Sequence, residues 1–443
     1  MRTEVLIVGG GVGGLTTALK LASCGIDVTV VEQQKGQAHT YKGELLQPKS
    51  LQIFDRLQVF SYVKESGHPL HTIKSIEKKK VKGTFETIGI STMNYGVIDS
   101  VFNYGLMIPH ERLKEILLEK AMTYPTFHYY QPARFVEFSD ETTGVVKYNG
   151  ETMFIQAKYI VGAEGRKSLV RKAMNLEIEE KRYDHHFLTV TFPRPTSMIE
   201  GEMIATPTTF LGLFPLPHDE VRSVYLIPSG EYKAIKEEGI ESFYKRYIEL
   251  CPALKGYVTQ IPSWRNIQLM IPVQFHAREY SKDNKVIIGD AAHSVHPMAG
   301  EGMNLAIQDA DALGDLICWM EETGESSLTN LKWLEKVRKP KVQHLLDTSH
   351  LAALAYSMPF RKFPRIRNRS FLQMEKDQKL HYKQMLNISG LGLWKESLLD
   401  RFIQLGLFPA RTSERSEAFF RKHMFTTAID YPWRNEGGEV HGH

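Results

Sequence analysis

The chain has 443 residues, of which 42% are hydrophobic and 24% are charged, and its formal net charge is +4. A chain of this length and ordinary globular composition predicts about two or three domains. The small net charge argues against nucleic acid as the main partner, and no uninterrupted apolar run is long enough to predict a transmembrane helix.

The start of the chain and its three cysteines indicate where in the cell the protein is expected. Met1 leads almost directly into an apolar strand, so we expect no signal peptide and a cytoplasmic location. The three cysteines, Cys24, Cys251 and Cys318, are odd in number and far apart. They predict free thiols in a reducing compartment, with no metal site and no redox pair.

The first functional signal is the glycine turn Gly9 to Gly14, with the sequence GGGVGG. It separates a strand predicted over residues 4–8 from a helix predicted over 15–23. The first, third and sixth residues of the turn match G-x-G-x-x-G. The first glycine permits the tight turn, the second lets the backbone approach a pyrophosphate, and the third lets helix and strand pack closely. The turn therefore predicts dinucleotide binding.

Two acidic residues follow predicted strands. A strand over residues 27–31 leads into Glu32, which suits a hydrogen bond to an adenosine ribose. Residues 159–171 indicate a strand, a turn and the start of a helix, and the turn contains Glu164 and Gly165. This second strand–turn–helix unit is the second functional signal.

The middle of the chain, residues 173–278, alternates short predicted strands with turns and predicts a mixed sheet that lines an apolar substrate pocket. The strands are predicted over residues 187–192, 202–205, 210–214 and 222–227. Phe210, Phe214 and Tyr225 are candidate pocket residues, with ordinary core packing as the alternative. His185, His186, His218 and His296 are candidate bases toward a phenol or heteroaromatic N–H, and packing or surface roles are the alternative for each.

The third signal, Gly289 to Asn304, is the most informative stretch of the chain. It follows a predicted buried strand at residues 286–288 and leads into a helix predicted over 305–319. A strand, a glycine-rich turn and a helix N-terminus together form a site for anions and dipoles. Two such sites far apart in one chain are unusual.

The C-terminal part, from about residue 346, has a mostly helical pattern. Residues 360–369 are basic with interleaved aromatic side chains, and an apolar region covers residues 391–407. We favour a solvated face for the basic stretch over contact with an anionic membrane surface.

The three signals in this order resemble those of the FAD-dependent aromatic monooxygenases with the p-hydroxybenzoate hydroxylase fold, the group A flavoprotein monooxygenases. That family is marked by G-x-G-x-x-G, an Asp-Gly motif and a Gly-Asp motif, matched here by Gly9 to Gly14, Glu164-Gly165 and Gly289-Asp290. The segment Gly43 to Pro48 resembles alkylquinolone, ubiquinone-pathway and squalene-type members. The resemblance extends to about residue 345.

The resemblance implies roles for particular residues. Pro297, Gly300 and His296 are expected at the reacting centre, and no metal is expected. The N-terminus of the long helix is expected to face the flavin pyrimidine edge, where it would stabilise the negative charge of reduced flavin. The residues expected to bind FAD are Gly9, Gly11, Val12, Gly13, Gly14, Glu32, Gln33, Arg112, Glu164, Asp290, Gly300, Gly302, Met303 and Asn304.

Three positions leave questions open. Many family members have an FAD-contacting arginine near the helix after Pro109, for which this chain offers His110 or Arg112. Glu164 stands where aspartate is usual, in a motif that is expected to serve both the FAD pocket and nicotinamide use. Glu301 stands where glutamine is frequent, near the expected flavin ring.

We therefore predict an α/β fold with a Rossmann-like FAD-binding domain built on a parallel sheet, an inserted mixed β-sheet substrate domain and C-terminal helices. The FAD-binding domain is predicted at residues 1–72, 101–172 and 279–345, the substrate domain at 73–100 and 173–278, and the helical region at 346–443.

The resemblance implies an FAD-dependent monooxygenase that uses NAD(P)H as a transient co-substrate and hydroxylates an apolar aromatic or heteroaromatic small molecule through a C4a-hydroperoxyflavin. The expected partner is an aromatic or lipid-like small-molecule substrate. The alternatives are an FAD-dependent reductase of prenyl chains, a halogenase of the same fold and a flavin-binding sensor. The halogenase motif W-x-W-x-I-P is missing, since Trp264 stands alone. We expect a monomer or a homodimer.

Overall fold

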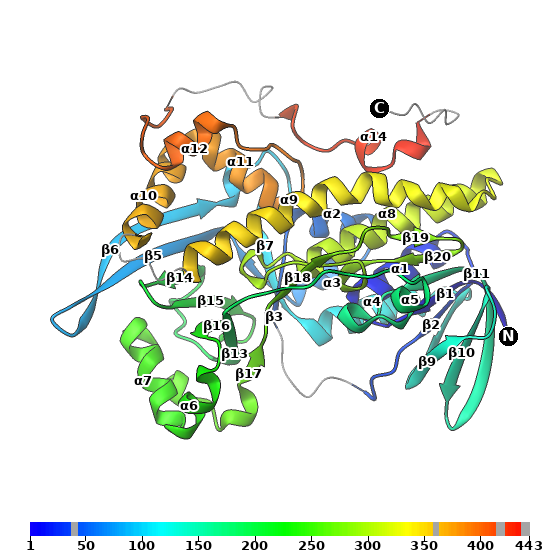
Figure 1. Ribbon diagram of the computed structural model, residues 1–443, viewed down its shortest axis with the longest axis horizontal. Helices are drawn as coiled ribbons and strands as arrows, with labels where there is room; N and C mark the ends of the chain where they lie inside the picture. The colour runs from blue at the N-terminus through cyan, green and yellow to red at the C-terminus, as the bar shows by residue number, and fades with distance from the viewer. Residues whose placement is uncertain (37–42, 358–362, 413–420, 436–443) are drawn as a thin grey trace.

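The computed structural model describes residues 1–36, 43–357, 363–412 and 421–435. Figure 1 shows two sheets at opposite sides of the molecule, with the long helices α8 (Gly302–Thr323) and α9 (Lys332–Ser357) running across it. The predicted fold class is confirmed: a parallel sheet, a second mixed sheet and C-terminal helices are all present.

The first sheet carries the dinucleotide-type core. Its strand order is β19-β20-β11-β1-β2-β8, and β11, β1, β2, β8 and β20 are joined by parallel pairs. Both glycine turns of the predicted site therefore emerge from carboxyl ends of parallel strands at the same sheet edge. The strands are β1 (Arg2–Val8), β2 (Val28–Val31), β8 (Phe127–Tyr130), β9 (Ala133–Phe138), β10 (Thr143–Tyr148), β11 (Glu151–Gly162), β19 (Ser281–Lys282) and β20 (Lys285–Ile287).

Apolar strands explain why this sheet is buried. β1 and β2 are runs of β-branched and aliphatic residues, and their central side chains have no solvent exposure. Strands buried on both faces need such continuous runs. Helix α1 (Val12–Ser23) packs against this sheet and between α8 and α4 (His110–Ala121). The result is one large hydrophobic core around α1.

The second sheet has the order β17-β13-β16-β15-β14-β5-β6, all antiparallel except for β14 with β5. Thus β5, which precedes the Glu164-Gly165 turn in the chain, pairs with β14, which follows that turn, and β6 extends the sheet beyond β5. Helices α6 (Glu231–Glu237) and α7 (Ile240–Leu250) lie beside it (Figure 1). The strands are β5 (Thr72–Val81), β6 (Thr84–Asn94), β13 (His185–Pro193), β14 (Gly201–Ala205), β15 (Phe210–Leu216), β16 (Glu220–Pro228) and β17 (Gln268–Met270).

Short elements complete the chain. One small sheet joins β3 (Gly43–Leu46), β7 (Gly105–Pro109) and β4 (His68–Leu70), and another joins β12 (Lys181–Arg182), β18 (Val273–His276) and β21 (His293–Ser294). The remaining helices are α2 (Pro48–Arg56), α3 (Phe60–Glu65), α5 (Leu169–Ala173), α10 (Phe363–Lys376), α11 (Gln378–Ser389), α12 (Leu398–Gln404) and α14 (Thr427–Asp430). No helix in the described part of the chain is both long and apolar enough to span a membrane.

The cysteine prediction was wrong. Cys24 and Cys318 form a disulfide, with their Cα atoms 6.2 Å apart, although 294 positions separate them in the sequence. The reason is the packing of α1 against α8, which brings the end of one helix beside the other. Sequence spacing alone does not reveal such a tertiary contact. Cys251 remains a free, buried cysteine.

Candidate functional site

The turn Gly9 to Gly14 is shaped for close backbone approach. Gly9 has φ +110°, and a Cβ atom there would lie 2.5 Å from the carbonyl oxygen of Ala163. A Cβ atom at Gly14 would collide with the Gly9 carbonyl oxygen, so this glycine allows the helix to pack on the strand. By contrast, a Cβ atom at Gly11 would meet no heavy atom within 4 Å. Helix α1 begins here without a side-chain cap, which leaves its N-terminal N–H groups for an anion.

Glu32 stands directly after β2 and faces the glycine turn. Its carboxylate accepts hydrogen bonds from the N–H of Gly10 and of Gln34, both at 2.7 Å. Glu32 is half-buried, whereas Gln33 is exposed. The carboxylate thus lies beside the turn, where a ribose next to a pyrophosphate would be.

Glu164 holds the second turn rigid. One of its oxygens accepts hydrogen bonds from the N–H groups of Leu169 (3.1 Å) and Val170 (3.0 Å), and the other from the Ser168 hydroxyl (2.7 Å). Burial raises the pKa of Glu164, and these donors oppose that shift. The longer side chain of glutamate reaches the first turn of α5, so it acts as a cap for that helix.

The three turns meet. A Cβ atom at Gly165 would lie 4.0 Å from Cβ of Asp290, and one at Gly13 would lie 3.2 Å from Cβ of Ala306 on α8. Arg171 links the second and third turns, because its buried guanidinium donates to the carbonyl oxygens of Ala291 (2.7 Å) and Arg166 (2.6 Å). This arginine was not predicted as a site residue from the sequence.

A buried ion network supports the third turn and was also missed. Asp309 on α8 has no solvent exposure and accepts hydrogen bonds from Gly289 N–H (3.0 Å), His293 Nε2 (2.6 Å) and Arg338 Nε (2.7 Å). Burial opposes its ionisation, but His293 and Arg338 together hold the pKa of Asp309 well below its usual value. An acid on the apolar face of the predicted helix over 305–319 is the signal that could have revealed it, since a buried charge needs partners.

The start of α8 is tied to the segment that precedes α2. Gly300 adopts a left-handed conformation with φ +63°, and α8 begins at Gly302 without a side-chain cap. The buried Asn304 side chain accepts from Gln47 N–H (2.8 Å) and the Ser50 hydroxyl (2.7 Å) and donates to the carbonyl oxygens of Leu45 and Gly300. Met303, beside it, is half-buried. Asn304 therefore fixes this helix N-terminus, where the resemblance places the flavin.

Glu301 is an unusual buried acid at the same place. Its side chain is 1% exposed, and neither carboxylate oxygen has a hydrogen-bond partner among the described residues. Burial raises the pKa of Glu301 well above its usual value; Gln47 offsets part of this shift, although its geometry falls short of a hydrogen bond. Glu301 is thus a buried polar group at the start of α8 that still needs a partner.

His296 holds the loop that contains Pro297. Its Nδ1 accepts from Met298 N–H (3.2 Å), and its Nε2 lies 2.9 Å from Nε2 of the buried His185 on β13. Burial lowers the pKa of His296 to about 3 and that of His185 to about 4, so both rings are neutral at pH 7. With both nitrogens engaged, His296 suits a positioning role better than the catalytic role expected from sequence. Pro297 and Met298 are half-buried next to it.

The two faces of the second sheet separate the predicted pocket residues. Phe210 packs with Met298, Leu226 and Tyr356 on the face toward the Pro297 loop. Phe214 alternates onto this same face and packs in two other apolar clusters. The pocket prediction for Tyr225 is wrong, and the alternative of core packing holds. Its side chain points to the opposite face and packs against Phe243 and Tyr247 of α7. Side chains alternate along a strand, and its neighbours Val224 and Leu226 face the loop.

Arg112 is engaged at the surface of α4. Its side chain is 40% exposed and pairs with Glu115 (3.1 Å) and Glu119 (3.5 Å). Its Nε also donates to the Ser66 hydroxyl at 3.4 Å. His110 begins the same helix and is half-buried. The geometry does not favour either residue as the FAD-contacting cation.

Comparisons with known proteins agree with this geometry. A family model described as an FAD binding domain matches residues 2–349. The 6-methylpretetramide 4-monooxygenase of Streptomyces rimosus is 29% identical over 325 residues, covering 72% of this chain and 75% of that protein. The 3-demethoxyubiquinol 3-hydroxylase of Escherichia coli (strain K12) is 23% identical over 335 residues, covering 73% of this chain and 82% of that protein.

Solved structures share the fold. PqsL of Pseudomonas aeruginosa, in complex with 2-aminobenzoylacetate, has a TM-score of 0.71 at 23% identity, covering 82% of this chain and 99% of that chain. The p-nitrophenol 4-monooxygenase PnpA of Pseudomonas putida DLL-E4 has a TM-score of 0.75 at 18% identity, covering 88% of this chain and 98% of that chain.

Proposed function

The chain belongs to the FAD binding domain family, and from that premise we propose that it is an FAD-dependent, NAD(P)H-consuming monooxygenase that hydroxylates an apolar aromatic or heteroaromatic small molecule. The observation that carries the proposal is the meeting of three turns, Gly9 to Gly14, Glu164-Gly165 and Gly289-Asp290, at one place. Relatives named as a 6-methylpretetramide 4-monooxygenase and a 3-demethoxyubiquinol 3-hydroxylase support the reaction class.

The residues at the site fit FAD. Open space at Gly11 and the uncapped start of α1 suit a pyrophosphate, and Glu32 suits the adenosine ribose. The uncapped start of α8 and Glu301, which has no hydrogen-bond partner in the described part of the chain, suit a polar ring edge. Bound FAD would supply the electron transfer from NAD(P)H to O2 and the transfer of one oxygen atom to the substrate.

The protein's own groups then have three tasks. The N-terminus of α8 stabilises negative charge placed before it. The neutral pair His185 and His296 holds the loop of Pro297 in one position. The apolar cluster around Phe210 excludes water from the space beside that loop, which limits loss of reduced oxygen as hydrogen peroxide.

The test is substrate-stimulated turnover. The purified protein should release FAD on denaturation, and a screen of small aromatics and quinolones should find compounds that stimulate NAD(P)H consumption with matching O2 uptake. Labelled O2 should add one labelled oxygen atom to the product. NAD(P)H consumption without O2 uptake would indicate a reductase, and a requirement for halide would indicate a halogenase. Bound FAD whose NAD(P)H consumption no compound stimulates would indicate a sensor.

The two faces of the sheet provide a matched pair for the pocket. Phe210→Leu should raise the KM for substrate about tenfold, because Phe210 packs beside Met298 of the Pro297 loop. Tyr225→Leu removes an aromatic ring of similar burial from the opposite face, so it should lower the melting temperature and leave KM unchanged. Steady-state kinetics and thermal unfolding of both variants check this. Equal effects of both variants on KM would place the pocket elsewhere.

Glu164 separates FAD binding from flavin reduction. Glu164→Ala frees the donors at the start of α5, and it should slow reduction of bound FAD by NAD(P)H about tenfold while FAD affinity changes little. Glu164→Asp keeps the charge and should change only the NAD(P)H KM slightly. Stopped-flow reduction and FAD titration distinguish the two effects. Reduction of the alanine variant at the wild-type rate would leave Glu164 with a structural role alone.

A further inference from the structure

An unusual group of exposed apolar side chains lies on and just after α12. The exposed fractions are 80% for Leu398, 49% for Leu399, 44% for Phe402, 46% for Leu405, 65% for Leu407 and 49% for Phe408. We call these six residues the α12 patch. Exposed apolar residues scattered singly need no explanation, but a contiguous group marks an interaction site.

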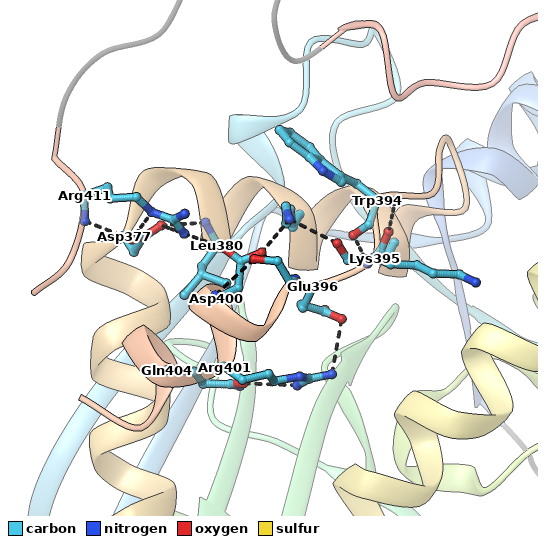
Figure 2. A network of polar contacts seen from close by, with 12 residues as sticks. Asp377, Leu380, Trp394, Lys395, Glu396, Asp400, Arg401, Gln404 and Arg411 are labelled. Atoms are coloured by element: carbon cyan, nitrogen blue, oxygen red, sulfur yellow. Dashed lines mark hydrogen bonds and ion pairs between the residues drawn. The ribbon is translucent and has the colours of Figure 1, made fainter. Parts of the chain in front are cut away.

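The helix that carries the patch is held firmly from its inner side. Asp400, which has no exposure, bonds to Lys383 Nζ of α11 (2.6 Å) and to Arg411 Nη2 (2.7 Å). Arg411 also pairs with Asp377 at the start of α11 (2.8 Å). Ser397 and Asp400 form a capping box at the start of α12. Figure 2 shows Asp400 among the other labelled groups of this network, so this face of α12 is fixed inward. The side chains of the α12 patch are exposed to solvent.

Cations flank the patch. Helix α10 packs beside α12, and Arg369 donates to the Gly406 carbonyl oxygen (2.5 Å). The exposed cations of this region are Arg365, Arg369, Lys376, Lys395 and Arg401. Among the described residues from 363 to 412, the acids that reach the surface are Glu375 and Glu396, and Glu396 pairs with Arg401. Among these described residues, the surface beside the patch therefore carries more positive than negative charge.

We propose that the α12 patch and its surrounding cations dock on an anionic phospholipid surface. Exposed apolar side chains with arginine and lysine beside them are the features that let a helix lie in a membrane interface. A second copy of the chain fits less well, because its own cations would face these cations. The contact is peripheral, since no helix in the described ranges can span a bilayer. This proposal differs from the expectation from sequence, which favoured a solvated face for the basic stretch over contact with a membrane. Residues 360–362 of that stretch lie outside the described residues.

The experiment is vesicle flotation of the full-length, FAD-loaded protein. Vesicles of phosphatidylcholine alone are compared with vesicles that also contain phosphatidylglycerol, at low and high salt. We expect flotation with the anionic vesicles that weakens at high salt, because exposed charges are screened. Leu398→Ser/Phe402→Ser/Phe408→Ser should lower the bound fraction at least about tenfold. Arg365→Glu/Lys376→Glu/Lys395→Glu should abolish the preference for anionic vesicles.

The matched control changes apolar side chains of similar exposure elsewhere. Met122 is 67% exposed and Ile199 is 57% exposed, and Met122→Ser/Ile199→Ser should float like the wild type. The FAD content of every variant shows that it is folded. Flotation of the patch variant at the wild-type level would overturn the proposal. A second result would also overturn it: the wild type does not bind vesicles, and in sedimentation it forms a concentration-dependent dimer that the patch variant does not form. That result would make the patch a contact between two copies of the chain.

Discussion

Asp309→Ala should cost about 3–5 kcal/mol of unfolding free energy, one of the two largest effects that we expect. Asp309 has no solvent exposure and pairs with Arg338 (2.7 Å), whose side chain is 3% exposed. Without the carboxylate, a guanidinium remains buried without its counter-charge. The Gly289 N–H also loses its acceptor, so the third glycine turn should loosen. Urea unfolding and FAD retention on gel filtration measure both consequences.

A double variant separates the ion pair from simple loss of packing. Asp309→Asn alone leaves Arg338 charged and buried, whereas Asp309→Asn with Arg338→Met removes both charges. We expect the double variant to be more stable than Asp309→Asn alone. Replacing both charges of a buried ion pair costs little free energy of unfolding, whereas removing one charge leaves the other buried without a partner. If the double variant instead loses the sum of the two single effects, Asp309 and Arg338 act independently.

The same carboxylate gives stability a pH dependence. His293 and Arg338 lower the pKa of Asp309 in the folded protein below its value in the unfolded chain. The stabilisation that ionised Asp309 gives the folded state is therefore fully present above about pH 5. It is lost as the pH falls below the pKa of Asp309 in the unfolded chain and toward its lower pKa in the folded protein. Asp309→Asn should lack this loss, so its stability should fall less steeply than that of the wild type between about pH 5 and 3.

Much of the fold could be predicted from the sequence, because it follows from local pattern. The strand predicted over 210–214 is observed as Phe210–Leu216, and the helix predicted over 305–319 is observed as Gly302–Thr323. The glycine turns were located for the same reason: a turn that needs a left-handed or uncrowded backbone selects glycine, as at Gly9 and Gly300.

The parts that the sequence did not predict depend on tertiary contacts. The disulfide of Cys24 with Cys318 exists because α1 packs on α8, and no spacing rule anticipates it. Tyr225 was assigned to the pocket by its aromatic type, but the register of β16 turns it to the face of α7. A shift of one residue along a strand changes the face, so the type of a side chain does not place it.

Glu164, which is half-buried, and Glu301, which is buried, form a contrasting pair of glutamates. Burial raises the pKa of both. Glu164, however, has the donors Ser168, Leu169 and Val170, whereas Glu301 has no hydrogen-bond partner among the described residues. Replacement by glutamine should therefore act in opposite directions. Glu164→Gln should destabilise the protein, because an amide N–H2 group would face the donors that now meet a carboxylate oxygen.

Glu301→Gln should stabilise the flavin-free protein by about 1–3 kcal/mol at pH 8. The pKa of Glu301 is higher in the folded protein than in the unfolded chain. Protonated Glu301 therefore stabilises the folded state relative to ionised Glu301, and this stabilisation is fully present below the pKa of the unfolded chain and is lost as the pH rises through the pKa of the folded protein. The stability of wild type and variant should therefore converge near pH 4 and separate at higher pH, as urea unfolding across that range would show. A gap that does not depend on pH would mean that Glu301 does not titrate in the fold. Because a buried acid without a partner lowers stability, we expect it to serve the start of α8, so the more stable variant should turn over more slowly.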